Sequence, residues 1–163
     1  FSEDFLNLNR RIIIHSGITE VKWLKGMCSV TSLSLPNTLK KIGARAFEGY
    51  SELSTITIPG NVIEIDPTAF IPNESGSKLK EILVENDNEC FKSINGILYD
   101  SEEKTLMCCP SGYNDEVNIP NTVEDIRAYA FFYCTNLKSV IIPESVTKVG
   151  TSASTSRHRH FRI

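Results

Sequence analysis

Short runs of alternating apolar and polar residues recur along the chain, and each run ends at an aliphatic residue followed by proline. The four pairs are Leu35-Pro36, Ile58-Pro59, Ile119-Pro120 and Ile142-Pro143, and the first two prolines, like the last two, lie 23 residues apart. Alternation with period two places every second side chain on one face of a β-strand. Proline has no amide hydrogen for a sheet, so it marks the end of such a strand. The pattern therefore predicts a repeated unit that contains one short strand.

A second constant feature is an Ala-Phe dipeptide whose phenylalanine lies 11 residues after the proline, as in Ala46-Phe47, Ala69-Phe70 and Ala130-Phe131. In the first copy, Ala46, Phe47, Tyr50 and Leu53 follow the spacing of one face of a short helix. The sequence thus predicts an α/β unit of about 23 residues, a strand followed by a short helix. A single unit cannot bury its apolar side, whereas stacked units share one core with ladders of phenylalanine, leucine and aliphatic residues. We therefore expect a solenoid.

The repeats place residues 1–150 in a single domain. We expect repeats near residues 14–34, 35–57, 58–83 and 119–141, and a partial copy at 142–150 that stops before any Ala-Phe pair. The first copy is degenerate, which is common at the end of an array. In residues 84–118, two apolar runs flank the polar turn from Asp100 to Lys104 and predict an inserted β-hairpin unit without the Ala-Phe helix. Residues 151–163 are expected to be a disordered or added tail.

At this level of detail the chain resembles a known family. The stretch "IPNTVEDIRAYAFFYCTNLKSVIIPESVTKVG" resembles the BspA-like leucine-rich repeat, and "NECFKSINGILYDSEEKTLMCCPSGYNDEVNIP" resembles the hairpin-bearing unit found in such arrays. The resemblance covers roughly residues 12 to 150. It implies a right-handed leucine-rich-repeat solenoid in a secreted or cell-surface protein. It also implies adhesion and the binding of host proteins, and it offers no common catalytic motif to transfer.

Composition narrows the function classes. The 163 residues carry a net charge of −3, so no strong attraction to nucleic acid or to an anionic membrane is expected. No apolar run approaches the roughly 18 residues of a membrane-spanning helix, so we expect no membrane insertion. The sequence contains no catalytic or phosphate-binding motif, which predicts a protein that is not an enzyme. The chain begins at Phe1 and has no signal-like segment, so we interpret it as a fragment or a processed chain.

Five cysteines are the main candidates for chemistry: Cys28, Cys90, Cys108, Cys109 and Cys134. An odd number leaves at least one thiol unpaired, and no C-x-x-C motif is present. Adjacent cysteines such as Cys108 and Cys109 rarely form a disulfide without strain. We expect Cys134 to be a small buried residue and most thiols to be reduced.

Metal and cofactor sites are not expected. The acidic stretches Glu85–Glu89 and Ser101–Glu103 contain oxygen ligands for Ca²⁺ but lack the spacing of a calcium loop, so solvated turns are favoured. His158, Arg159 and His160 fall in the expected tail, and His15 is isolated among apolar residues. We therefore predict no cofactor and no metal.

The outward positions of the predicted strands form the candidate partner-binding face. They are rich in serine and threonine, with apolar additions: Thr31, Ser32, Ser34, Ser54, Thr55, Thr57, Lys80, Glu81, Leu83, Lys138, Ser139 and Ile141. Threonine also suits a plain solvated β-surface, so this pattern alone does not establish binding. Because solenoids commonly bind through such faces, we expect a protein or a glycan as partner.

Three functions remain open at this stage. The first is a non-enzymatic binding module that acts in adhesion at the cell surface or after secretion. The alternatives are a structural spacer and an accessory domain that presents a neighbouring catalytic domain. The incomplete last repeat also predicts self-association through the C-terminal end.

Overall fold

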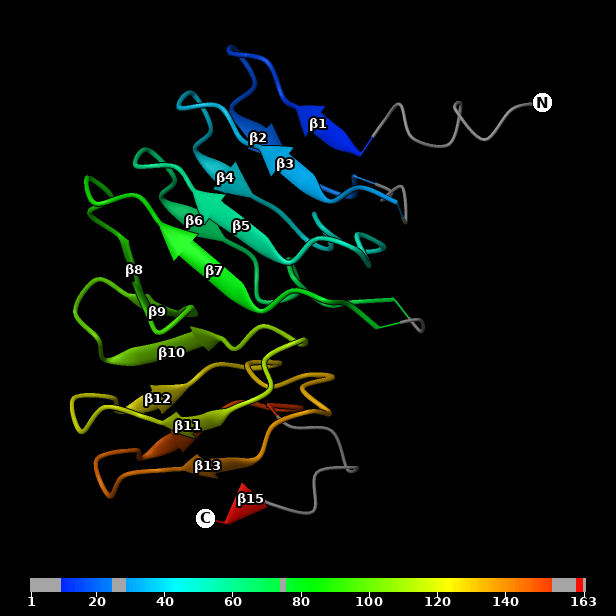
Figure 1. The fold of residues 1–163 in the computed structure, drawn as a ribbon. Helices are drawn as coiled ribbons and strands as arrows, with labels where there is room; N and C mark the ends of the chain where they lie inside the picture. Colours follow the sequence, from blue (N-terminus) through cyan, green and yellow to red (C-terminus); the bar gives the residue numbers. More distant parts are fainter. Residues whose placement is uncertain (1–9, 25–28, 74–75, 154–160, 163) are drawn as a thin grey trace.

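The structure, a computed structural model, describes residues 10–24, 29–73, 76–153 and 161–162. Each regular unit has two short strands, which we call its first and its second strand. The first strands are β1 (Arg11–Ile13), β3 (Ser32–Ser34), β5 (Thr55–Ile58), β7 (Glu81–Val84), β11 (Glu116–Asn118) and β13 (Ser139–Ile141). The second strands are β2 (Glu20–Val21), β4 (Lys41–Ile42), β6 (Glu64–Ile65), β12 (Asp125–Ile126) and β14 (Lys148–Val149). Figure 1 shows the units stacked in sequence order, as predicted for a solenoid.

Strands of successive units pair in parallel. Among the first strands, β1 pairs with β3, β5 with β7, and β11 with β13, whereas β3 and β5 are in contact without a ladder of their own. Among the second strands, β2, β4 and β6 form one sheet, and β12 pairs with β14. Equivalent residues lie opposite each other, for example Ile42 opposite Ile65. The fixed sequence spacing therefore becomes a fixed register, and it stacks like residues on like.

A tight turn joins the two strands of each unit at the recurrent proline. Its carbonyl oxygen accepts a hydrogen bond from the amide three residues later, at 3.0 Å for Leu39 on Pro36 and 3.2 Å for Val62 on Pro59. This is a β-turn with proline at its first position. The aliphatic residue that closes the turn is fully buried in both units. The proline thus ends the first strand, as predicted, and the aliphatic partner returns the chain to the core.

The predicted short helix is wrong, because no helix occurs among the described residues. Residues 44–49 form consecutive turns instead, with single bonds such as Glu48 to Arg45 at 3.2 Å. The amide of Phe47 donates to Ala69 of the next unit, at 3.0 Å, so it cannot continue a helical ladder. Arg45 and Gly49 also adopt left-handed backbone, with φ of 51° and 88°. The turns still bury the predicted side chains of Ala46, Phe47, Tyr50 and Leu53.

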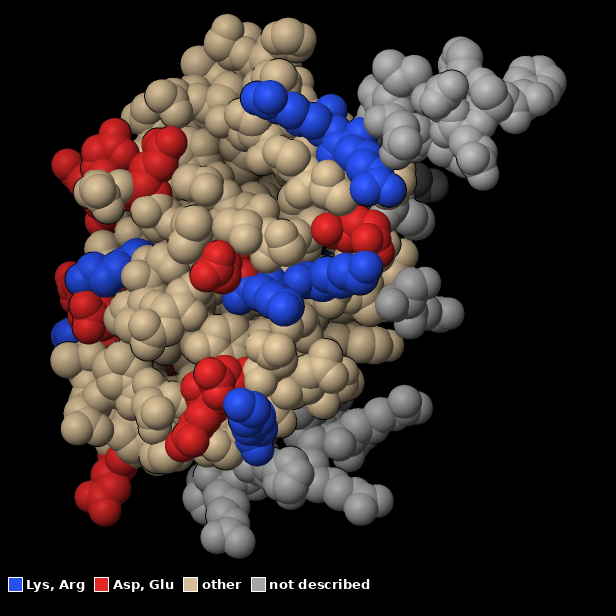
Figure 2. Space-filling model, viewed as in Figure 1, with Lys and Arg blue, Asp and Glu red and all other residues tan. Residues whose placement is uncertain are grey.

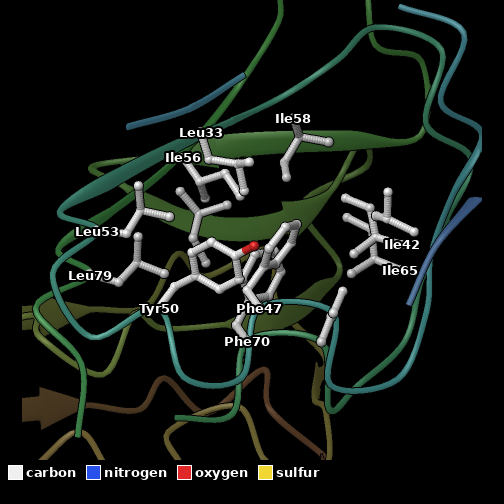
Figure 3. Close-up of a cluster of buried hydrophobic side chains, with 14 of the residues drawn as sticks. Leu33, Ile42, Phe47, Tyr50, Leu53, Ile56, Ile58, Ile65, Phe70 and Leu79 are labelled. Atoms are coloured by element: carbon white, nitrogen blue, oxygen red, sulfur yellow. The ribbon is translucent and has the colours of Figure 1, made fainter. Parts of the chain in front are cut away.

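The ladders of core side chains are confirmed. Phe47 and Phe70 stack with ring centroids 5.3 Å apart and planes 26° apart. Figure 3 shows their rings among aliphatic side chains from both rows of strands. Phe131 is completely buried in the second half of the chain. Full burial of one such ring contributes roughly 1.5–3 kcal/mol, so the repeated phenylalanine is a major source of stability.

The predicted hairpin joins β9 (Ile97–Asp100) to β10 (Thr105–Cys108), which pair antiparallel with Leu106 opposite Tyr99. A further strand, β8 (Phe91–Ile94), pairs antiparallel with β9 through the tight turn at Asn95-Gly96. β10 then pairs in parallel with β12, so it replaces a second strand in the stack. Of the side chains on β9, Leu98 belongs to the core of the first half, whereas Ile97 and Tyr99 belong to that of the second half. The hairpin unit therefore divides the core in two while keeping the array continuous.

The stack extends beyond Gly150. Ala153 is buried, and its carbonyl oxygen accepts a hydrogen bond of 2.7 Å from the amide of Phe131, as Ala69 does from Phe47. Further on, β15 (Phe161–Arg162) pairs in parallel with β13, with Phe161 opposite Val140. The rest of the predicted tail, including its histidines, lies outside the described residues.

Candidate functional site

The outward side chains of β1, β3, β5, β7, β11 and β13 form a surface that we call the first-strand face. Alternation along each strand sends every second residue into the core and the others to solvent. On β5, for example, Ile56 and Ile58 are buried whereas Thr57 is exposed. The parallel register places Thr55 beside Glu81 and Thr57 beside Leu83. The face is therefore built from aligned rows of side chains.

The twelve residues predicted for partner binding are all exposed or half-buried. Eight of them lie within first strands: Ser32, Ser34, Thr55, Thr57, Glu81, Leu83, Ser139 and Ile141. The other four immediately precede a strand: Thr31, Ser54, Lys80 and Lys138. The sequence pattern thus identified solvent-facing positions correctly. Their exposure alone does not test whether they bind a partner.

The structure brings together nine of these residues, those of β3, β5 and β7 and the positions just before them. These three strands are adjacent, since β3 contacts β5 and β5 pairs with β7. The remaining three belong to β13 and the position before it, in the sheet of β11, β13 and β15. The hairpin of β8 and β9 lies between β7 and β11 in the chain, and β7 contacts both of its strands. The first-strand face therefore consists of two segments.

Sequence reasoning missed four outward residues of this face. Arg11 and Ile13 on β1 lie beside Ser32 and Ser34, and Glu116 and Asn118 on β11 lie beside Ser139 and Ile141. The sequence contained a signal that predicts β11 as a strand. Glu116-Val117-Asn118 directly precedes the pair Ile119-Pro120, just as Thr55-Ile56-Thr57 precedes the pair Ile58-Pro59.

The first-strand face combines hydroxyl groups with isolated exposed aliphatic side chains. Ile13, Leu83 and Ile141 are 52%, 38% and 52% exposed. Charges of both signs are scattered over the side of the molecule shown in Figure 2, where positive and negative groups lie next to each other in several places and uncharged surface covers the rest. Lys138 forms an ion pair with Asp115 at 3.1 Å. A hydrogen bond from the amide of Glu116, and then Lys138, hold the pKa of Asp115 below its usual value. Such a surface favours contact by shape and hydrogen bonding rather than by strong charge attraction.

The opposite surface, formed by the second strands, is different. Glu20, Lys41 and Glu64 lie side by side on β2, β4 and β6 and alternate in charge. Lys41 and Glu64 form an ion pair at 2.7 Å. The hydrogen bond and the charge of Glu64 raise the pKa of Lys41. Exposed ion pairs of this kind contribute little to the free energy of folding, so the second-strand surface is an ordinary solvated sheet surface.

The surroundings of the cysteines indicate packing roles rather than reactive thiols. Cys90, Cys108 and Cys109 are free thiols, and Cys28 lies outside the described residues. Cys134 is fully buried, as predicted, and its Sγ lies 3.4 Å from the carbonyl oxygen of Cys109. Burial raises the pKa of both Cys108 and Cys109 well above its usual value. Because the thiolate is the reactive form, these two thiols are poor nucleophiles.

The acidic stretches are turns held by backbone contacts. The carboxylate of Asp100 accepts hydrogen bonds from the amides of Lys104 and Thr105, at 2.8 and 3.0 Å. In the other stretch, the carboxylate of Glu85 accepts from the amide of Gly60 at 2.8 Å. Within the described ranges, no group of three His, Cys, Asp or Glu side chains is arranged to hold a metal ion. No helix of the described part has the length and apolar character needed to cross a membrane.

Comparison with known families gives a match over most of the chain. A model of the BspA type leucine rich repeat region matches residues 18–104 and 102–156, in six copies. No curated protein matches the chain.

Three solved structures have a similar fold. A leucine rich cell surface protein from Faecalibacterium prausnitzii is 33% identical, with a TM-score of 0.73 over 88% of this chain and 38% of its own. The pneumococcal vaccine antigen PcpA is 23% identical, with a TM-score of 0.75 over 93% of this chain and 38% of its own. A leucine-rich repeat protein from Eubacterium ventriosum is 22% identical, with a TM-score of 0.59 over 88% of this chain and 50% of its own. The chain thus spans half or less of each of these proteins.

Proposed function

Because the chain belongs to the BspA type leucine-rich repeat family, we propose that it is a protein-binding module that acts in adhesion as part of a cell-surface or secreted protein. The observation that carries the proposal is the first-strand face, where solvent-facing hydroxyl groups lie in register around exposed aliphatic side chains. Binding interfaces typically have a small apolar centre within a polar rim. The 33% identity to a bacterial leucine rich cell surface protein supports the location.

The partner class that fits this face is a folded extracellular protein, including one from a host. The face has no concentrated charge to select nucleic acid or an anionic surface. Its strands are short and regular, so it offers a broad contact area rather than a deep pocket for a small molecule. The hydroxyl and aliphatic side chains of the face suit contact with another protein, so we propose binding without catalysis.

Leu83 is the test position. It is an exposed aliphatic residue on β7, in the longer segment of the face. Ile63, just before β6, is also exposed, at 64%, but it precedes a second strand and serves as the matched control. We would measure binding of the chain to a panel of immobilised extracellular-matrix proteins by surface plasmon resonance. Leu83→Glu should weaken binding about tenfold or more, because a charge at the centre of an interface is desolvated. Ile63→Glu should leave binding unchanged.

The alternative functions make different predictions in the same experiment. A structural spacer, or an accessory domain that presents a neighbouring catalytic domain, needs no contact with a partner through the first-strand face. If no protein of the panel binds, or if both variants lose binding equally, the adhesion proposal fails and the spacer or accessory role is favoured.

A further inference from the structure

A polar cleft of about 440 Å³ lies apart from the first-strand face, where loops of four successive units converge. Its lining comes from residues 51–52, 76–78, 111, 133 and 135–136. These segments belong to the units on both sides of the inserted hairpin and to the hairpin unit itself. The volume is within the range of about 300–1,000 Å³ that is usual for small-molecule sites. Most such sites are lined by apolar side chains, whereas this lining is dominated by serine, threonine, tyrosine and asparagine.

Two backbone contacts hold the walls of the cleft together. The amide of Lys78 donates to the carbonyl oxygen of Ser51 at 2.9 Å, and the amide of Gly112 donates to that of Leu79 at 2.7 Å. A Cβ atom at Gly112 would lie only 2.7 Å from the carbonyl oxygen of Leu79, so no other residue fits there without a shift of the backbone. Side chains that line the cleft are therefore held on a preformed frame. A preformed site loses less entropy when a ligand binds.

Ser111 gives the cleft a specific polar anchor. The residue is only 8% exposed, and its hydroxyl has no hydrogen-bond partner among the described residues. Burial of an unsatisfied hydroxyl is unfavourable, and such groups are uncommon in folded proteins. Ser111 lines the cleft, and its hydroxyl oxygen is buried just behind that wall, so a rotation of the side chain about its Cα–Cβ bond would present the hydroxyl to a ligand.

The charges of the cleft cancel. The carboxylate of Glu52 and the ammonium group of Lys78 pair with each other at 2.8 Å. The other polar groups of the lining are uncharged hydroxyls and the amide of Asn136. This arrangement favours a neutral ligand that donates and accepts many hydrogen bonds over an anion or a cation.

An aromatic cluster borders the polar groups. Tyr133 lines the cleft, and its ring packs against Phe132, with centroids 4.9 Å apart. Phe132 in turn contacts Tyr129 edge to face, with centroids 5.6 Å apart. All three residues are half-buried, so part of the cluster remains accessible. Tyrosine presents an apolar ring together with a hydroxyl, which suits a ligand that has an apolar C–H face and polar edges.

We propose that this cleft binds a neutral saccharide, with Tyr133 against the sugar ring and with Ser111 and Asn136 as hydrogen-bond partners of its hydroxyls. A saccharide is uncharged, carries hydroxyl groups around its edge and has a less polar face, so it matches the three properties of the lining. The site is separate from the first-strand face. The chain could therefore hold a protein and a glycan at the same time.

The proposal can be tested by titrating the full chain with neutral tetrasaccharides while recording amide NMR spectra. Maltotetraose, cellotetraose, chitotetraose and mannotetraose serve as probes, and a heparin tetrasaccharide serves as the anionic comparison. At least one neutral probe should shift the amides of Ser51, Lys78, Ser111 and Thr135 at concentrations up to about 10 mM, which would detect even weak affinities. Shifts caused by heparin alone, shifts confined to other surfaces, or no shifts with any neutral probe would overturn the proposal.

Two serine variants separate binding from folding. Ser111→Ala should weaken binding of the active saccharide about fivefold, which corresponds to one lost hydrogen bond. Its melting temperature should stay the same or rise, because an unpartnered buried hydroxyl is removed. Ser145→Ala is the control, since the hydroxyl of Ser145 is also buried without a partner in the described part but does not line the cleft. It should leave binding unchanged. Equal affinity of both variants and the parent chain would exclude Ser111 from a sugar site.

A second pair of variants tests the exposed rim of the cleft. Asn136→Ala should also weaken saccharide binding, whereas Asn118→Ala, an exposed asparagine on β11, should not. Binding to protein partners through the first-strand face should be unaffected by Ser111→Ala and Asn136→Ala. Failure of the adhesion proposal and failure of the saccharide proposal can therefore be distinguished.

Discussion

Nη1 of Arg127 donates a hydrogen bond of 3.0 Å to the backbone carbonyl oxygen of Ile65, 62 residues earlier in the chain. In regular units this carbonyl position accepts from a backbone amide of the next unit. Ile42 accepts from Asp66 at 2.8 Å, and Ile126 accepts from Gly150 at 2.7 Å. After Ile65 the next unit is the inserted hairpin, and a side chain from the unit beyond supplies the donor. Arg127 also contacts Sδ of Met107 on β10, at 3.6 Å. The Arg127 side chain therefore completes the row of hydrogen bonds between successive units at the point where the hairpin unit interrupts it.

Replacing Arg127 should weaken this junction. Arg127→Met leaves the carbonyl oxygen of Ile65 without its charged donor, and a hydrogen bond to a charged group contributes about 1.5–3 kcal/mol. We expect the free energy of unfolding in urea to fall by about that amount. Lys148 is exposed on β14, which belongs to the same sheet as β10 and β12. Lys148→Met should change the free energy of unfolding by less than about 0.5 kcal/mol. Equal effects of the two substitutions would show that the Arg127 contact does not join the two halves.

Phe131 should be far more important for stability than its neighbour Phe132. Phe131 is completely buried, whereas Phe132 is half-buried in the aromatic cluster beside the cleft. Phe131→Ala removes a full ring from the core and should lower the free energy of unfolding by roughly 3–5 kcal/mol. Phe132→Ala should cost clearly less. Thermal and urea unfolding of both variants would measure the difference, and a shift of only a degree or two for Phe131→Ala would contradict the proposed alignment of repeats.

The sequence predicted the stack and its register but not the shape of the Ala-Phe segment. The fixed spacing from proline to phenylalanine was sufficient to place Phe47, Phe70 and Phe131 in the core. A helical spacing of Ala46, Phe47, Tyr50 and Leu53 also describes a series of turns that buries the same side chains. The deciding contact is long-range, because the amide of Phe47 bonds to Ala69 of the next unit. Local periodicity contains no information about that partner.

The hairpin unit shows a signal that was present and overlooked. Asn95-Gly96 separates the two four-residue strands β8 and β9, and both residues have positive φ, at 52° and 80°. Asn-Gly between two apolar runs is the strongest short signal for a two-residue hairpin turn. The prediction used only the longer polar turn at Asp100–Lys104. It therefore found β9 and β10 and missed β8.

The two candidate binding regions differ in how far sequence could predict them. The first-strand face follows from alternation along each strand, so most of its exposed positions were identified without a structure. The cleft is built from loops of four units, and no periodic pattern marks its residues. Its frame depends on the close approach of Gly112 to Leu79, a contact between the hairpin unit and the unit before it. Only the folded stack reveals that Ser111 and Asn136 line the same cavity.

The cysteines should be reduced and protected in the native state. Burial raises the pKa of Cys108 and Cys109, so almost none of either thiol is ionised at pH 8, and the thiolate fraction controls alkylation. Titration of the denatured, unreduced chain should find most of its five thiols free. Without denaturant at pH 8, mass spectrometry after iodoacetamide should show Cys109 unmodified. Two stoichiometric disulfides, or rapid native labelling of Cys109, would contradict this prediction.

The last strand should protect the C-terminal edge of the stack. β15 pairs with β13, and without it the edge of Ser139–Ile141 would have no strand partner on that side, next to the exposed side chain of Ile141. An unpaired sheet edge is a template for association with another chain. A chain that lacks residues 154–163 should therefore melt at a lower temperature, and sedimentation should show an apparent mass that rises with concentration.

A charge on the uncovered edge provides the control. Lysine on edge strands suppresses pairing between chains, so Ile141→Lys in the shortened chain should restore a monomer without restoring the melting temperature. This combination separates loss of edge protection from loss of packing, since packing is not recovered by a charge in solvent. The full chain should sediment as a monomer over the same concentrations, because β15 covers the edge of β13 through which the sequence alone predicted self-association. If the shortened and full chains have the same melting temperature and mass, pairing of β15 with β13 contributes nothing in solution. Association of the full chain would show that the edge stays accessible even with β15 in place.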